Sequence, residues 1–198
     1  MNREPILQMV RQFVEAEMAN NDAAHDRDHV GRVVELTKTL CRAYPQADRF
    51  RAELLAWLHD MNDDKLSSNV GVVRVSDFLR SCHTPEEDVR FIAAAIPYIS
   101  YRKHPRLTED VPLEIRIVQD ADRIDAMGAV GVARTFAYGG AKQRSLTDSL
   151  QHFDEKLLRL YDLLSTEEAK RIAQPRHAFL QAFYNQYQAE IGASDSAL

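Results

Sequence analysis

Apolar residues recur along this chain at the three- and four-residue spacing of amphipathic helices. The spacing is clear in residues 4–20 and again from about Asp28 to Tyr44, where Pro45 ends it. No segment shows the strict alternation of apolar and polar residues that is typical of a half-buried strand. We therefore predict an all-α fold in which residues 1–198 form a single-domain helical bundle.

Residues that favour helix starts divide the middle of the chain into further helices. Asp48 is placed to cap a helix that ends in an apolar run at Leu58. The next segment, residues 65–83, contains the β-branched sequence VGVVRV, but its apolar spacing favours a helix over a strand. Thr84 and Pro85 then have the residue types of a helix cap and a first helical position.

Glycine and proline residues set the predicted limits of the later helices. Pro112 opens a long helix in which Gly128 and Gly131 favour a break into two pieces. The Gly139-Gly140 pair is predicted to end this helix. Pro175 is predicted to kink or divide the last helix of the chain.

Composition is that of an ordinary soluble globular protein. The 198 residues carry a net charge of −5, which argues against a broad surface for nucleic acid or membranes. No run approaches the roughly 18 apolar residues of a membrane-spanning helix, and charges interrupt every apolar window at the N-terminus. Cys41 and Cys82 are isolated in the sequence, which favours a reduced, cytoplasmic protein.

The apolar run that ends at Leu58 passes directly into a cluster of charged side chains. In the stretch LLAWLHDMNDDK, His59 and Asp60 follow the run, and Asp63 and Asp64 come soon after. Histidine and carboxylate groups are costly to hold near a core unless something binds them. We therefore expect a binding site at this helix end.

Two other segments carry side chains that suit the same site. His29 opens the second predicted helix, and Asp120, Asp122 and Asp125 lie in QDADRIDA on the helix that Pro112 opens. Two imidazoles and two carboxylates from three helices could surround one divalent ion. Such a mixed set of nitrogen and oxygen ligands favours Mn, Fe, Co or a similar metal over a thiolate-rich zinc site.

The order His29, His59-Asp60, Asp122 resembles the H…HD…D signature of the HD-domain metal-dependent phosphohydrolase superfamily, an all-helical fold. An upstream HxxRV and a downstream ADRID accompany it, so the resemblance covers residues from about 25 to 140. The phrases HDxxDDK and VQDADRIDAMGAVGVARTFAYGG are similar to the YedJ/YpgQ-like branch, and this likeness extends into the C-terminal helices that would complete the bundle. It implies a hydrolase of nucleotide phosphoanhydrides that releases pyrophosphate from nucleoside triphosphates.

The resemblance implies one divalent metal ion, with Mn as the first choice and Mg, Fe, Co or Ni as alternatives. His25 competes for the first ligand position but lacks the following xxRV, and Asp120 and Asp125 are alternates for the last one. Two-metal relatives carry extra histidines between HD and the last Asp. His83 and His104 lie in that interval, but in a helix-cap and a loop context that favour one metal. The implied ligands are His29, His59, Asp60 and Asp122.

The resemblance also implies roles for charged side chains around the metal. Asp63 and Asp64 fall where the stringent-response alarmone hydrolases of the same superfamily carry a Glu-Asp pair, which helps to activate water and to handle the leaving group. The first position is Asp here, one methylene shorter than Glu. The cations expected to neutralise the substrate phosphates are Lys65, Arg32 and Arg123, with Lys142 and Arg144 as a second, mobile clamp.

Two classes of function remain open at this point. The first is an enzyme, with a nucleoside triphosphate pyrophosphohydrolase ahead of a nucleotidase or phosphodiesterase of the same superfamily. The second is a non-catalytic, nucleotide-binding regulatory domain, which the intact ligand set disfavours because a silent domain has no chemical need for all four side chains. The expected partner is a small nucleotide, with no nucleic acid and no membrane. The aromatic residues near the C-terminus leave a homodimer open.

Overall fold

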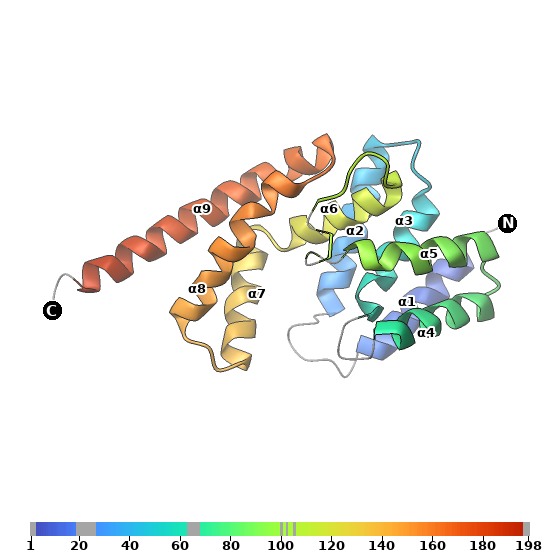
Figure 1. The fold of residues 1–198 in the computed structure, drawn as a ribbon, viewed down its shortest axis with the longest axis horizontal. Helices are drawn as coiled ribbons and strands as arrows, with labels where there is room; N and C mark the ends of the chain where they lie inside the picture. Colours follow the sequence, from blue (N-terminus) through green and yellow to red (C-terminus); the bar gives the residue numbers. More distant parts are fainter. Residues whose placement is uncertain are drawn as a thin grey trace. The chain divides into compact units, whose positions relative to one another are not determined.

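Helices account for the regular secondary structure of the described residues, which are 3–18, 27–62, 68–99, 101, 103–104 and 106–195 of a computed structural model. No strand occurs in these ranges, so the all-α prediction is confirmed (Figure 1). The helices group into two compact units, Met1–Asp122 and Arg123–Leu198. That residues 1–198 form a single domain stays a prediction.

The N-terminal unit contains a helix that is buried around most of its circumference. Seven of the ten residues of α3, Arg49–Leu58, are buried, which is typical of a helix in a protein core. Asp48 caps this helix as predicted, because its carboxylate accepts hydrogen bonds from the backbone N–H groups of Phe50 and Arg51. The other helices of this unit are α1 (Glu4–Met18), α2 (Arg27–Ala43), α4 (Ser68–Ser81), α5 (Glu86–Ile99) and α6 (Leu113–Asp125), the last of which continues past the unit boundary.

The sequence VGVVRV belongs to helix α4 despite its β-branched residues. Val75 and Leu79 lie four residues apart on one face of α4, and both side chains are buried. The helical spacing of these core residues therefore outweighs the strand propensity of the segment. Helices α4 and α5 lie side by side (Figure 1), and the favoured helix is confirmed.

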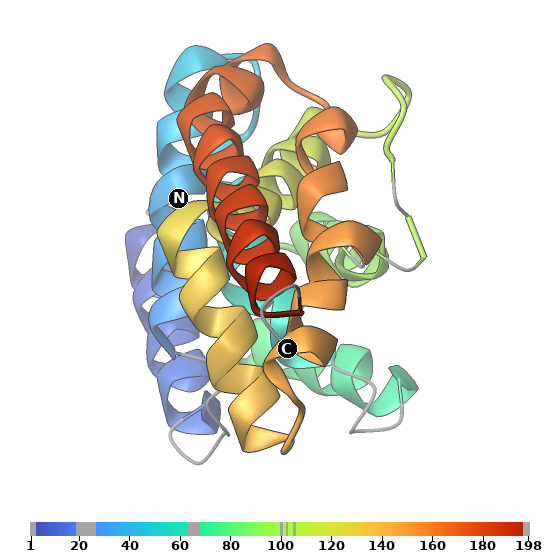
Figure 2. The same ribbon diagram turned by 90° about the vertical axis from the view of Figure 1, so that its left-hand side faces the viewer.

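Three helices of the C-terminal unit enclose an aromatic cluster. The ring of Phe153 is fully buried, and its centroid lies 6.1 Å from that of Phe136 and 5.6 Å from that of Phe183. Aromatic rings at these separations attract one another in addition to burying apolar surface. Figure 2 shows the elements of this unit from yellow through orange to red: α7 (Gly128–Ala141), α8 (Leu146–Glu155), the 3-10 turns η2 (Leu157–Arg159) and η3 (Tyr161–Leu163), and α9 (Glu167–Asp195).

The glycine predictions hold at one end of α7 and fail at the other. Helix α6 ends at Asp125 and α7 begins at Gly128, whose φ of 71° lies in the left-handed region, so the predicted break is confirmed. The prediction that Gly139-Gly140 ends the helix is wrong, because α7 continues to Ala141. Gly139 instead permits close packing of α7 on α8, since a Cβ atom there would lie 2.1 Å from Oγ of Ser149.

Pro175 does not divide the last helix. It lies inside α9, which is assigned as helix from Glu167 to Asp195, so this part of the prediction is wrong. A proline removes one backbone hydrogen bond and crowds the carbonyl four residues earlier, which can bend a helix without ending it. The helix therefore tolerates it.

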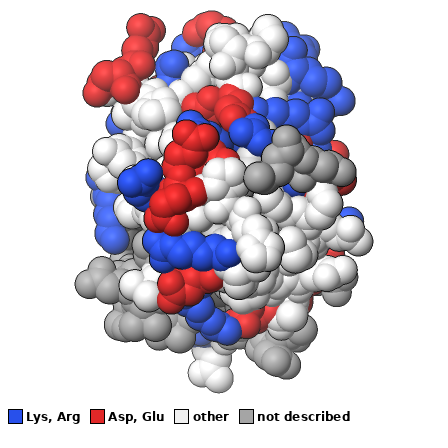
Figure 3. All heavy atoms as spheres, turned by 90° about the vertical axis from the view of Figure 1, so that its right-hand side faces the viewer, with Lys and Arg blue, Asp and Glu red and all other residues white. Residues whose placement is uncertain are grey.

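The surface and the thiols agree with the composition. On the face drawn in Figure 3, acidic and basic side chains alternate down the middle, so the positive charges there are accompanied by negative ones. No helix among the described residues is both long enough and apolar enough to cross a bilayer. Cys41 and Cys82 are free and buried, as their isolation in the sequence indicates.

Candidate metal centre

The four side chains predicted to bind metal lie in the N-terminal unit and come from three parts of the chain. His29 lies in the first turn of α2, and Asp122 lies near the end of α6. His59 and Asp60 begin a 3-10 turn, η1 (His59–Asn62), that follows α3 directly. His29 and His59 are buried, with 4% and 7% of their surface exposed, whereas the side chains of Asp60 and Asp122 are about one-third exposed at 27% and 30%.

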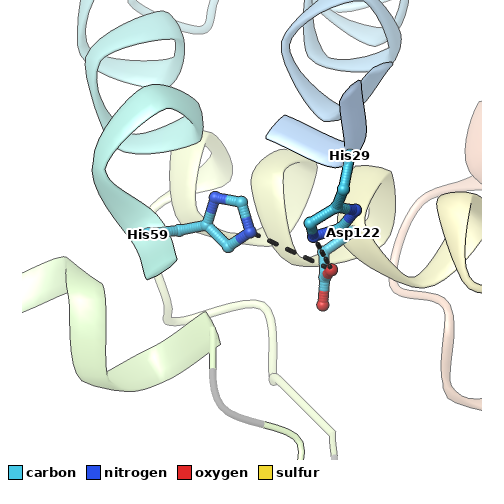
Figure 4. A group of neighbouring side chains, drawn as sticks. All are labelled: His29, His59 and Asp122. Atoms are coloured by element: carbon cyan, nitrogen blue, oxygen red, sulfur yellow. Dashed lines mark ion pairs between the residues drawn. The ribbon is translucent and has the colours of Figure 1, made fainter. Parts of the chain in front are cut away.

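The polar atoms of these side chains converge. Nε2 of His29 lies 3.4 Å from Oδ1 of Asp122 and 3.6 Å from Oδ2 of Asp60. Nε2 of His59 lies 3.4 Å from Oδ1 of Asp60 and 4.0 Å from Oδ1 of Asp122. Figure 4 shows both imidazole rings and the Asp122 carboxylate turned toward one another, and ligand atoms from these three residues all lie within 4.8 Å of one another. Atoms bound about 2.1 Å from one ion are about 3 to 4.2 Å apart, so the cluster has roughly the size of a metal site.

A hydrogen bond determines which nitrogen of His59 faces the cluster. Nδ1 lies 2.8 Å from the carbonyl oxygen of Ala56. Because a carbonyl only accepts, Nδ1 carries the proton, and Nε2 of the neutral ring keeps its lone pair. A histidine that binds metal is commonly oriented in this way by a backbone carbonyl.

The converging atoms of this cluster are acceptors, and this decides whether the cluster suits a metal ion. The lone pair of Nε2 and the carboxylates of Asp60 and Asp122 are all acceptors, and acceptors at these separations repel one another unless a cation lies among them. A second proton on one histidine ring would relieve the repulsion at that ring only, whereas one divalent ion would relieve it for all four side chains. The donor set therefore fits a divalent metal with nitrogen and oxygen ligands.

The local sequence explains why His59 is buried and Asp60 is not. His59 continues the buried face of α3, in which residues 54–56 and Leu58 are buried. Consecutive side chains of a 3-10 helix are about 120° apart, so Asp60 turns away from the core. A buried imidazole and a more exposed carboxylate thus come from adjacent residues and still approach the same point.

The structure brings Asp122, rather than its alternates, to the two histidines. Asp120 and Asp125 lie on the same helix but are fully buried. Oδ2 of Asp125 accepts a hydrogen bond of 2.9 Å from Nη1 of Arg134 in the C-terminal unit. His25, the alternate for the first histidine, lies outside the described residues.

The two histidines considered for a second metal have other surroundings. His83 is exposed and has a φ of 55°, at the turn between α4 and α5. The ring of His104 stacks on Tyr98, with centroids 4.4 Å apart. Neither residue is in the group that could hold an ion among the described residues.

The residues predicted to manage water and phosphate are only partly described. Arg32 lies one helical turn after His29 on α2 and is partly exposed, so it is close in sequence and helix position to the cluster. Arg123 is buried, and its Nη1 donates a hydrogen bond to the carbonyl oxygen of Leu163. Asp63, Asp64 and Lys65 lie outside the described residues.

The two cations of the predicted second clamp are exposed and meet at one aromatic ring. Nζ of Lys142 lies 5.8 Å from the ring centroid of Tyr138, and Cζ of Arg144 lies 5.3 Å from it. The backbone N–H of Arg144 donates to the carbonyl of Gly139, which closes a turn with Gln143 at a φ of 55°. This segment is thus a hydrogen-bonded turn at the end of α7, and its role as a clamp stays a prediction.

The hydrogen bond from His59 to the Ala56 carbonyl was not predicted from the sequence. A backbone carbonyl leaves no trace in residue type, so the only available signal is position. Ala56 lies three residues before His59, where a histidine at a helix end can reach back to a carbonyl of the last turn.

Comparison with known proteins gives the family. Residues 27–127 match the family model of the HD domain. The chain is 35% identical over 196 residues to YpgQ of Bacillus subtilis (strain 168), covering 96% of this chain and 95% of YpgQ. The crystal structure of Bacillus subtilis YpgQ in complex with ADP matches with a TM-score of 0.78 and 32% identity, over 93% of this chain and 97% of that one. That of an HD-superfamily hydrolase from Bacillus thuringiensis matches with a TM-score of 0.77 and 35% identity, over 97% and 100% of the two chains. The predicted family is therefore confirmed, and this chain belongs to the HD domain family.

Proposed function

We propose that this protein is a metal-dependent phosphohydrolase that converts nucleoside triphosphates to monophosphates and pyrophosphate. The observation that carries the proposal is the convergence of two imidazoles and two carboxylates, from His29, His59, Asp60 and Asp122, at one partly exposed point. The name of the Bacillus thuringiensis relative supports a hydrolase, and the ADP complex of YpgQ supports a nucleotide as the ligand.

These four side chains would hold one divalent ion, with Mn ahead of Mg, Fe, Co and Ni. When bound, such an ion lowers the pKa of a coordinated water from about 15.7 toward about 7 and polarises a phosphoryl oxygen. With such an ion bound, the two buried imidazoles would face it from the core, and the two carboxylates would offset its charge. The carbonyl of Ala56 keeps Nε2 of His59 unprotonated and directed at the site.

Charged residues near the metal would supply the remaining chemistry. Asp63 and Asp64 follow the HD pair closely, and we assign them jointly to orienting the attacking water and taking its proton. Neither carboxylate receives an individual proton role, because protons shared by two strongly interacting groups belong to the pair. Lys65 and Arg32 are the first candidates to bind the substrate phosphates, followed by Lys142 and Arg144. The burial of Arg123 and its hydrogen bond to the Leu163 carbonyl disfavour the role predicted for it.

Phosphorus NMR with a nucleoside triphosphate and Mn²⁺ tests the proposal directly. Release of pyrophosphate and a monophosphate is the expected result, because it reports attack at the α-phosphate. Release of orthophosphate would favour a nucleotidase of the same superfamily. If no nucleoside mono-, di- or triphosphate released phosphate or pyrophosphate, the enzyme itself would be excluded and a regulatory domain favoured.

Two substitutions separate metal binding from turnover. Asp60→Ala removes a predicted ligand, so we expect loss of both bound metal and activity with helix content retained. Asp64→Asn removes a carboxylate predicted to act on water, so metal should remain bound while turnover falls by about 100-fold or more. Asp77→Ala is a matched control, because Asp77 is an exposed carboxylate that pairs with Arg80 on α4. Full metal occupancy in Asp60→Ala would rule that residue out as a ligand.

A further inference from the structure

Three consecutive residues directly after Asp122 are each bonded to a distant part of the C-terminal unit. Arg123 donates a hydrogen bond to the carbonyl of Leu163 in η3. The carbonyl of Ile124 accepts a hydrogen bond of 2.8 Å from Nη1 of Arg176 in α9. The carboxylate of Asp125 accepts one of 2.9 Å from Nη1 of Arg134 in α7. The residue types of Arg123 and Asp125 had suggested a substrate contact and an alternate metal ligand, and neither of their bonds is apparent from the sequence.

These bonds stabilise the last turn of α6, which would otherwise be prone to fraying. Helix α6 ends at Asp125, so Asp122 lies in its last turn. The last four carbonyls of a helix have no partner within the helix, and helix ends fray for this reason. Arg176 supplies a donor to one of these carbonyls, and its positive charge also suits the negative end of the helix dipole.

The turn that follows α6 is tightly packed. A Cβ atom at Gly131 would lie 2.0 Å from the carbonyl oxygen of Ala126, so no other residue fits there without movement of the backbone. A Cβ atom at Gly128 would lie 3.2 Å from Cβ and Cγ of Arg176, which places α9 directly against the start of α7. Met127 N–H bonds to the Ile124 carbonyl at 3.1 Å, so this carbonyl has two donors.

We propose that Arg134 and Arg176 are positioning residues for Asp122. By bonding residues 124 and 125, they keep the last turn of α6 helical, and this turn carries the Asp122 carboxylate. A metal site requires its ligands to be held within about 0.5 Å, and a frayed last turn would not meet this requirement. The inference rests on the proposed metal centre, and it adds two residues that are not themselves ligands.

Binding of Co²⁺ without substrate tests the inference. Co²⁺ binds nitrogen and oxygen ligands more tightly than Mn²⁺, so weakened variants stay measurable, and its visible absorption reports the geometry of the ligands. We expect Arg176→Met to weaken Co²⁺ binding by about tenfold and to change the absorption spectrum, as loss of an outer-shell partner commonly does. Arg176→Lys keeps a donor for the Ile124 carbonyl and should recover most of the affinity.

A double-substitution cycle shows whether the effect acts through Asp122. In a protein that already carries Asp122→Ala, Arg176→Met should cause no further loss of Co²⁺ affinity. A loss of the same size in both backgrounds would overturn the inference. Unchanged affinity and spectrum in both Arg176→Met and Arg134→Met would overturn it as well.

Two further variants separate positioning from folding. Gly139→Ala disturbs the packing of α7 on α8 without touching residues 123–125, so it should lower the melting temperature and leave Co²⁺ affinity unchanged. If Arg134→Met fails to fold, the double variant Arg134→Met with Asp125→Asn avoids a buried charge, and it should still bind Co²⁺ more weakly than the wild type. Normal affinity in that double variant would count against Arg134.

The measurement distinguishes this inference from the proposed reaction. A wild-type protein that binds Co²⁺ but hydrolyses no nucleotide would exclude the reaction and leave the positioning role intact. A wild-type protein that binds no divalent metal would exclude the centre, and the positioning role with it.

Discussion

Nδ1 of His59 lies 2.8 Å from the carbonyl oxygen of Ala56, one turn earlier in the chain. This bond requires a proton on Nδ1 and leaves Nε2 as the nitrogen that faces Asp60 and Asp122. The orientation of the ring is therefore determined by the helix that precedes it, before any ligand is present.

The tautomer of His59 is the first prediction. Above the pKa of the ring, nitrogen-15 NMR should show a proton on Nδ1 of His59 and none on Nε2. Addition of Zn²⁺, which is diamagnetic, should shift the Nε2 signal strongly and the Nδ1 signal little, because the metal binds the nitrogen that carries the lone pair. A proton on Nε2 in the metal-free protein would contradict the structure, and an unchanged Nε2 signal would remove His59 from the ligand set.

The register of α6 is the second prediction. Asp122→Ala should abolish bound Mn²⁺, because Oδ1 of Asp122 lies 3.4 Å from Nε2 of His29. Asp120→Ala should retain metal, since its carboxylate is fully buried. Asp125→Ala removes the partner of Arg134, so it should weaken metal binding without abolishing it. Metal analysis after dialysis measures the difference. If only Asp120→Ala lost its metal, Asp120 rather than Asp122 would be the ligand.

The parts of this site that follow from local sequence could be predicted, and those that depend on distant contacts could not. An apolar run that stops at His59 and Asp60 is visible in one segment of the chain. The resemblance already favoured Asp122 over Asp125, but the bond that Asp125 makes with Arg134, nine residues further along the chain, follows from no spacing rule. The bond from Arg123 to the Leu163 carbonyl joins residues 40 positions apart, and it likewise cannot be predicted from the sequence.

The same distinction explains where the fold prediction failed. Helical spacing of buried residues identified α4 correctly, because burial of Val75 and Leu79 outweighs strand propensity. Gly139 and Gly140 look like a helix end, yet Gly139 is required by the close approach of α8 at Ser149. The sequence alone does not distinguish a glycine that is needed for close packing from one that is needed for a turn.

The ion pair of Arg134 and Asp125 is the basis of the third prediction. The Asp125 side chain is 1% exposed, and removal of one partner of such a pair leaves a buried charge that loses its main counter-ion. We expect Arg134→Met to lower the free energy of unfolding by about 3 kcal/mol in urea denaturation. A loss below about 1 kcal/mol would mean that other groups satisfy Asp125.

A matched pair in the N-terminal unit serves as the comparison. Arg51 and Asp88 have almost the same exposure, 27% and 0%, as Arg134 and Asp125, and the bond is 2.6 Å long. The second carboxylate oxygen of Asp88 is buried and has no hydrogen-bond partner among the described residues. Arg51→Met should therefore cost at least as much stability as Arg134→Met. The reverse order would show that Asp88 depends less on its arginine than the geometry indicates.

The thiols give a fourth prediction. Burial, with a smaller contribution from the charge of Glu53, raises the pKa of Cys41 to about 11. Burial also raises the pKa of Cys82. Only the thiolate reacts readily, and at pH 8 about one Cys41 thiol in a thousand is ionised. Folded protein should therefore react with a disulfide reagent at least 100-fold more slowly than urea-unfolded protein. Fast reaction of one thiol would place it at the surface, and Cys41→Ser and Cys82→Ser would identify which.

The fifth prediction concerns His152 on α8. Burial lowers the pKa of His152, and the positive charges of Lys156 and Arg144 lower it further, while Glu155 opposes them. The unfolded chain therefore binds a proton at a higher pH than the folded protein does. Stability is fully present above the unfolded pKa of about 6.5 and is lost as the pH falls below it toward the folded pKa.

His152→Gln removes this titration. Between about pH 7.5 and pH 5.5, the wild type should lose more free energy of unfolding than His152→Gln does, as measured by urea denaturation at each pH. Arg144→Gln should raise the pKa of His152 in a proton NMR titration, because one of the nearby positive charges is gone. Equal losses in wild type and His152→Gln would show that protonation of His152 is not resisted by the fold. A pKa unmoved by Arg144→Gln would place that cation too far from the ring to act on it.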